Sequence, residues 1–126
     1  MGDKTRNLQW RQRNKVDYDG DTVTQVLAAT TDTVVLTHPF VKLDSSAGAV
    51  TTLTLPNGEP GQMLILQSID DNDMELTPAT AHGWSALTLA QTGDQVTLLY
   101  ANDTAGWIIL GSFGDTVGSN PAITIA

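Results

Sequence analysis

The feature that most constrains this chain is a series of short runs rich in Thr, Val and Leu, separated by turn-forming residues, that begins at Thr22. The runs expected to form strands are Thr22–Ala28, Thr33–Thr37, Val41–Leu43, Val50–Leu55, Met63–Ser68, Met74–Thr77, Ala86–Leu89, Val96–Ala101 and Trp107–Leu110. A spacing of about 8–12 residues between such runs is typical of a β-sandwich or β-barrel. No stretch of the sequence shows the apolar stripe of a helix. The pattern therefore predicts an all-β domain.

The connections between these runs have the composition of turns. Leu55–Gly58 contains an Asn-Gly pair, which accepts positive φ angles, and Pro60-Gly61 predicts a second turn. Asp70–Asp73 is expected to be a polar loop tip. The segment Asp115–Ala126 is polar until Ile123–Ile125, which is interpreted as a final strand, in place or exchanged with a neighbour, or as a frayed end.

Alternation along the strands predicts which side chains are buried. Leu53 and Leu55 share a face with Thr51, and the opposite face is expected to carry Val50, Thr52 and Thr54. In contrast, 63–66 and 96–100 are nearly continuous apolar runs, as expected for strands covered on both faces. In a domain of this size the second cover is predicted to be another subunit.

Charge divides the chain into two parts. The cations Lys4, Arg6, Arg11, Arg13 and Lys15 against Asp3 give residues 1–16 a net charge of +4, so the remainder carries −12 of the chain's net −8. We therefore expect a basic N-terminal arm over 1–16, extended or without fixed structure, and an acidic β domain over 17–126.

The arm is the sharpest functional feature of the sequence. Arg6, Trp10, Arg11 and Arg13 are the predicted contacts with another protein or an adjacent subunit, because Arg and Trp often anchor interfaces. A solvated tail is the plainer interpretation. Nucleic acid is the least favoured partner, because the acidic body would repel a polyanion.

No motif in the sequence indicates an enzyme, a cofactor or a metal. The chain has no cysteine, and no glycine-rich phosphate loop or Gly-x-Ser-x-Gly elbow is present. Asp17–Asp21 resembles the start of a calcium loop, but the twelfth position is Ala28 where an EF-hand needs Glu. His38 and His82 each precede a turn former and are interpreted as ordinary loop residues. We expect no catalytic residue and no metal site.

Neither a signal peptide nor a membrane span is expected. Residues 1–16 are too polar for the apolar part of a secretory signal, and no apolar run approaches the length of about 20 residues that crosses a bilayer.

Among the aromatic residues, Trp84 is the candidate ligand contact, because it lies in a predicted loop where a ring could stack on a sugar. Tyr100 ends an apolar run and is expected in the core.

The segment 53–111 carries a recurring pattern: a Leu-Pro-x-Gly turn with Gly-Gln, a Thr-Pro-Ala stretch, a Gly-Asp turn before Val-Thr-Leu-Leu-Tyr, and a closing Gly-Trp-x-x-Leu. The matching positions are Leu55, Pro56, Gly58, Gly61, Gln62, Thr77, Pro78, Ala79, Gly83, Gly93, Asp94, Val96, Leu98, Tyr100, Gly106, Trp107 and Leu110. This pattern resembles a short β module of phage virion proteins, found in head decoration, head fibre and tail fibre proteins. The resemblance implies a homotrimeric, β-rich assembly without catalytic residues.

Together, the pattern and the resemblance predict a small sandwich or β-tulip-like barrel with an extended N-terminal arm. The expected function is that of a capsid decoration (cement) protein on the virion surface, with the arm contacting the major capsid protein or an adjacent subunit. The alternative is a tail or head fibre component that binds a host receptor or glycan, with Trp84 and the 70–73 loop facing the ligand.

Overall fold

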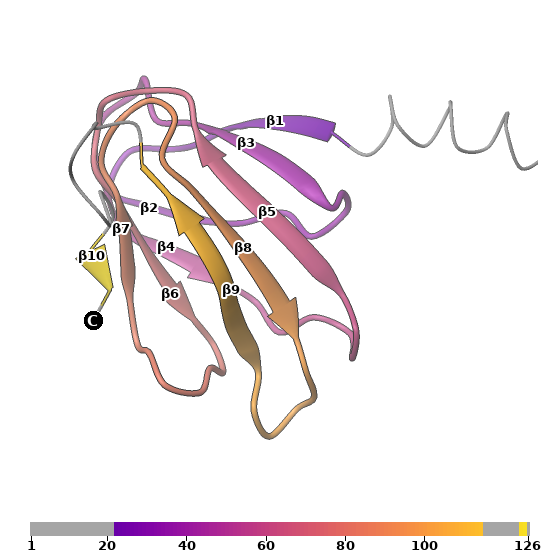
Figure 1. Cartoon of the computed structure of the whole chain (residues 1–126). Coiled ribbons are helices and arrows are strands. Elements are labelled where there is room, and N and C mark those ends of the chain that lie inside the picture. The colour runs from indigo at the N-terminus through magenta and orange to yellow at the C-terminus, as the bar shows by residue number, and fades with distance from the viewer. Residues whose placement is uncertain (1–21, 115–123, 126) are drawn as a thin grey trace, which may run out of the picture.

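The computed structural model of the 126-residue chain describes residues 22–114 and 124–125, and the predicted arm lies outside them. The described residues form ten β-strands and no helix (Figure 1). The strands are β1 Thr22–Val26, β2 Thr31–Thr33, β3 Phe40–Asp44, β4 Val50–Leu55, β5 Met63–Ser68, β6 Met74–Pro78, β7 Leu87–Leu89, β8 Gln95–Tyr100, β9 Trp107–Phe113 and β10 Thr124–Ile125. The prediction of an all-β protein is confirmed. No helix in this part of the chain is long and apolar enough to cross a membrane.

The strands form two five-stranded mixed sheets, in the orders β1-β3-β5-β8-β9 and β10-β7-β6-β4-β2. From β1 to β6 each successive strand joins the opposite sheet, so β1, β3 and β5 pair in parallel, and so do β2, β4 and β6. Strands β7 to β10 then complete both sheets with antiparallel pairs. A parallel pair needs a crossover connection, which is often a helix. Here a strand of the facing sheet occupies that position.

One apolar core lies between the two sheets. Its side chains are those that the period of two directs inward, and they are almost completely buried: Leu27, Val34, Val41, Leu43, Val50, Leu53, Leu55, Leu64, Leu66, Met74, Leu76, Trp84, Leu87, Leu89, Val96, Leu98, Tyr100 and Trp107. Full burial of one such side chain contributes about 1.5–3 kcal/mol before the cost of ordering the chain. The described residues contain no buried side-chain nitrogen or oxygen without a hydrogen-bond partner.

The burial of Val50 differs from the expected alternation. Leu53 and Leu55 are buried as predicted, but Val50 is buried beside them instead of on the opposite face. The register between β4 and β6 shifts between Val50 and Leu53, which indicates a bulge. An extra residue in a bulge changes the face on which the preceding side chains lie, so simple alternation fails here.

The turn after β4 also differs in detail from the expectation. Gly58 does not have a positive φ; the positive φ of this turn is at Gly61, at 87°. Glycine is required at position 58 because of close packing, since a Cβ atom there would lie 2.9 Å from Cζ2 of Trp107.

Two more expectations can be compared with the strands. The strand predicted over 33–37 is misplaced: β2 covers Thr31–Thr33, so it shares only Thr33 with the prediction, although Val34 N still donates a hydrogen bond to Thr54 O at 2.9 Å. At the C-terminal end, Thr124–Ile125 pairs with β7 of the same chain. Of the alternatives for this segment, a final strand in place is therefore the one observed.

Candidate functional site

Trp84 lies in the apolar core. Its side chain is 8% exposed, and its Nε1 donates a hydrogen bond to the carbonyl oxygen of Trp107 at 2.9 Å. The Gly83 backbone before it has a φ of 86°, a conformation that favours glycine. A buried ring offers no broad face on which a sugar could stack, so the ligand contact expected at Trp84 has no exposed surface to support it.

Tyr100 and Trp107 extend this aromatic cluster. Their rings meet edge to face, with centroids 5.1 Å apart, and Nε1 of Trp107 donates to Pro56 O at 2.8 Å. The Tyr100 hydroxyl donates to Asp103 Oδ1 at 2.7 Å. Burial, followed by the hydrogen bond and charge of Asp103, raises the pKa of Tyr100 to about 12. The three aromatic side chains therefore stabilise the fold and do not form a surface platform.

Carboxylates gather at the end of the molecule where β3 and β5 finish. The loops over 45–49, 69–73 and 90–94 meet there: Asn72 Nδ2 donates to Ser45 O at 2.8 Å, and Thr92 N donates to Asp71 Oδ1 at 3.0 Å. These contacts join the 69–73 loop to both of its neighbours. We call this region the acidic end; its carboxylates are Asp44, Asp70, Asp71, Asp73 and Asp94.

Asp44 and Asp70 lie close together, so that Asp70 in its protonated form donates a hydrogen bond to the Asp44 carboxylate. Hydrogen bonds from Ser46 lower the pKa of Asp44, and the bond with Asp44 is the main cause that raises the pKa of Asp70. Asp71 differs, because hydrogen bonds from Thr92 lower its pKa. Sequence analysis missed the Asp44–Asp70 pair, since the two residues are far apart along the chain and no motif links them.

The acidic end does not have the arrangement of a metal site. Within the described residues, no group of three or more His, Asp or Glu side chains could hold a metal ion. Asp71 Oδ1 accepts hydrogen bonds from both the amide and the hydroxyl of Thr92. The calcium-like run 17–21 lies outside the described residues.

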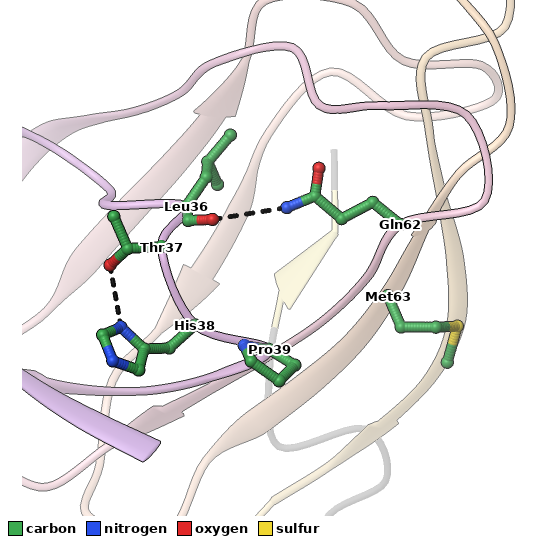
Figure 2. A pocket seen from close by; sticks show the side chains of 6 residues that line it. All are labelled: Leu36, Thr37, His38, Pro39, Gln62 and Met63. Atoms are coloured by element: carbon green, nitrogen blue, oxygen red, sulfur yellow. Dashed lines mark hydrogen bonds between the residues drawn. The ribbon is translucent and has the colours of Figure 1, made fainter. Parts of the chain in front are cut away.

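The two histidines lie on separate loops. The His38 ring is hydrogen-bonded through Nδ1 to Thr37 Oγ1 at 2.8 Å, and it lines a shallow pocket of about 360 Å³ (Figure 2). Leu36, Pro39, Gln62 and Met63 complete the lining together with Thr37. Gln62 Nε2 donates to Leu36 O at 3.5 Å, so this amide is directed to the backbone. His82 is exposed in the connection between β6 and β7.

The outer faces of the two sheets differ in chemistry. On the β2-β4-β6-β7 side, outward positions carry threonines in register, such as Thr33, Thr54 and Thr77. On the β3-β5-β8-β9 side, one end is apolar: Met63, Leu99 and Ile108 form one row, and Phe40 and Ile65 begin the next. We call Phe40, Met63, Ile65, Leu99 and Ile108 the apolar patch.

The apolar patch explains the continuous apolar runs of β5 and β8. Leu64 and Leu98 point into the core, whereas Met63, Ile65 and Leu99 lie on the outside, where Met63 is 43% exposed. The core thus covers the inner face of β5 and β8, which is one of the two faces expected to be covered. Coverage of the second face by another subunit stays a prediction.

The predicted contacts Arg6, Trp10, Arg11 and Arg13 lie outside the described residues, so the structure does not bring them together with any surface. The place where the arm joins the body is defined, however. Thr22 begins β1 and pairs with Phe40 at the start of β3, at the end of the molecule opposite the acidic end. The first described residue, Thr22, therefore lies at the end of the sheet opposite the acidic end.

Comparisons with known proteins add information about the fold alone. No protein-family model matches the chain, and no curated protein matches it. A solved structure described as "Structure of a chaperone-substrate complex" is similar to it, with a TM-score of 0.52 and 23% sequence identity. The similarity covers 72% of this chain and 18% of the other, so this chain spans less than a fifth of the length of the protein that it matches.

Proposed function

We propose that this chain is a phage virion structural protein, a capsid decoration protein that binds the outer surface of the capsid as a homotrimer and stabilises it. The proposal is supported by the resemblance of 53–111 to a virion β module and by the charge of the two parts of the chain. It assigns no catalytic residue and no cofactor.

The observation that carries the proposal is the division of charge along the sequence, +4 over residues 1–16 against −12 over the remainder. The chain enters the body beside Phe40, whereas Asp44 and the 70–73 loop lie at the far end of the same strands. A surface of negative potential would attract the arm and repel the acidic end, and so would orient the protein as it approaches. The acidic end would then face away from the capsid.

In this mechanism the arm makes the contacts and the sandwich is the rigid body. Arg6, Arg11 and Arg13 bind carboxylates of the major capsid protein, because guanidinium groups form bidentate hydrogen bonds with them. Three arms in a homotrimer bind neighbouring capsid subunits at once. Weak contacts then add up to a strong attachment, because each bound arm raises the effective concentration of the next.

A capsid-binding experiment tests this function. Purified protein is mixed with empty, expanded capsids, and the bound copies are counted after sedimentation. We expect saturation at a fixed copy number, and loss of binding when residues 1–16 are deleted. A variant with Arg6, Arg11 and Arg13 replaced by Gln should bind much more weakly than one with Lys at the same positions. No binding by the full chain would refute the capsid role, and full binding after the deletion would refute the arm mechanism.

The alternative of a fibre component that binds a host glycan is less well supported. Its expected contact, Trp84, is buried, which leaves the 70–73 loop as its remaining candidate surface. A glycan array with the full chain would decide the matter, and reproducible binding that is lost in Asp73→Ala would favour the fibre function.

A further inference from the structure

The apolar patch lies on the outer face of its sheet, where Met63 is 43% exposed and the other four side chains are half-buried. Rows of Met63, Leu99 and Ile108 and of Phe40 and Ile65 lie next to each other across β3, β5, β8 and β9. The opposite outer face carries threonines at the equivalent positions. An apolar group of this kind on a soluble protein is typical of an interaction site.

The first described residue, Thr22, lies at the level of this patch. Thr22 pairs with Phe40, which pairs with Ile65, and the Met63 row lies one step further toward the end from which the arm departs. Strands in a sheet are about 4.8 Å apart, so β9 lies roughly 20 Å from β1. Eleven residues lie between Trp10 and Thr22, and this segment can span up to about 40 Å. The arm is therefore long enough to cross the whole patch.

The chemistry of the arm matches this surface. Leu8 and Trp10 are its only sizeable apolar residues, and in an extended chain they point to the same side, opposite to Arg11 and Arg13. The connections beside the patch carry two acids of the body, Glu59 and Asp103 (sequence positions between β4 and β5 and between β8 and β9). Their negative charges favour a basic segment over another acidic surface.

We infer that the arm of each chain lies extended across its own apolar patch, with Leu8 and Trp10 packed on the patch and Arg11 and Arg13 facing outward. The same chain is the source, because the short connection to Thr22 gives the arm a high effective concentration at the patch. This inference rests on the proposed function only where it assigns the outward arginines to the capsid. It gives Trp10 a contact within the subunit and leaves Arg11 and Arg13 free to bind.

Limited trypsin digestion of the full chain tests the inference without any capsid. Trypsin cuts after Lys and Arg, and five of the six such residues lie in the arm; the sixth is Lys42 in β3. A docked arm resists cleavage because the protease must bind an undocked segment of chain. We expect cleavage after Arg11 and Arg13, followed by mass spectrometry, to be about tenfold slower than in a synthetic peptide of residues 1–20.

Matched variants locate the docking surface. Met63→Thr combined with Ile108→Thr should restore the cleavage rate of the peptide and shift the Trp10 emission to longer wavelength. The control is Val26→Thr, which replaces a 68% exposed side chain at the other end of the same sheet and should leave the protection unchanged. Circular dichroism should show that all variants remain folded.

Three results would overturn the inference. The first is cleavage of the unmodified chain at the rate of the peptide, and the second is protection that survives the Met63→Thr, Ile108→Thr double variant. The third is protection that falls on dilution, since it would mean that the arm docks on a second copy. Failure of capsid binding with the arm still protected would refute the proposed function alone.

Discussion

Nε1 of Trp84 donates a hydrogen bond of 2.9 Å to the backbone carbonyl oxygen of Trp107, which joins the connection after β6 to the first residue of β9. The donor is buried, so its loss leaves a carbonyl group without this partner. Trp84→Phe should lower the free energy of unfolding by about 1–3 kcal/mol. Urea denaturation measures the change, and the exposed-site variant Val26→Thr should differ by less than about 0.5 kcal/mol.

Gly106 is required by both its backbone angle and its surroundings. Its φ is 66°, and a Cβ atom there would collide with the backbone of Thr80, whose carbonyl accepts a hydrogen bond from the Trp107 amide. Gly106→Ala should therefore cost more than the about 1–3 kcal/mol expected for the backbone angle alone.

Gly61→Ala provides the matched control for this substitution. Gly61 also has a positive φ, 87°, but its Cβ atom would have no neighbour within 4 Å. The difference between the two variants in thermal denaturation therefore measures the collision. Equal losses would show that the contact with Thr80 is unimportant.

The Asp44–Asp70 pair predicts a specific pH dependence. The hydrogen bond with Asp44 raises the pKa of Asp70 in the folded protein. Asp70 therefore contributes to folding stability below its pKa in the unfolded chain, and this contribution is lost as the pH rises through its pKa in the folded protein. Asp70→Asn keeps a donor for Asp44 at every pH. The melting temperature of the variant minus that of the unmodified protein should therefore increase from pH 4 to pH 7.

Asp71→Asn should change the stability at neutral pH in the opposite direction to Asp70→Asn. Hydrogen bonds from Thr92 lower the pKa of Asp71 in the folded protein. Asp71 therefore contributes to folding stability above its pKa in the unfolded chain, and this contribution is lost as the pH falls through its pKa in the folded protein. The variant should be less stable than the unmodified protein at pH 7, and the difference should shrink in acid. Differences that stay constant with pH in both variants would contradict the assignment of these shifts.

The Tyr100 hydroxyl should ionise only near pH 12, because burial and the hydrogen bond to Asp103 disfavour the phenolate. Absorbance at 295 nm during an alkaline titration measures this ionisation, and Tyr18→Phe removes the signal of the other tyrosine. Asp103→Asn should lower the midpoint. Ionisation of Tyr100 near pH 10, the ordinary value for tyrosine, would show that the buried contact does not persist in solution.

The positions of the strands were largely predictable, because the period of two and the turn residues act locally. The pairing of strands was not: alternation determines the face on which Leu64 or Leu98 lies, but it contains no information about the neighbouring strand. The same limit applies to the candidate site. The burial of Trp84 depends on a carbonyl group 23 residues away, and the contact between Asp44 and Asp70 depends on how two loops meet.

The alternation of β1 to β6 between the two sheets has a consequence for how the protein folds. In this part of the chain no strand pairs with its neighbour in sequence, so its backbone ladders join segments about twenty residues apart. The described local hairpins are β6–β7 and β8–β9, in the later half. Closing long loops before any contact is gained slows the search for the native state. We therefore expect folding on the scale of milliseconds to seconds, with the first strands pairing only after the later ones have been synthesised.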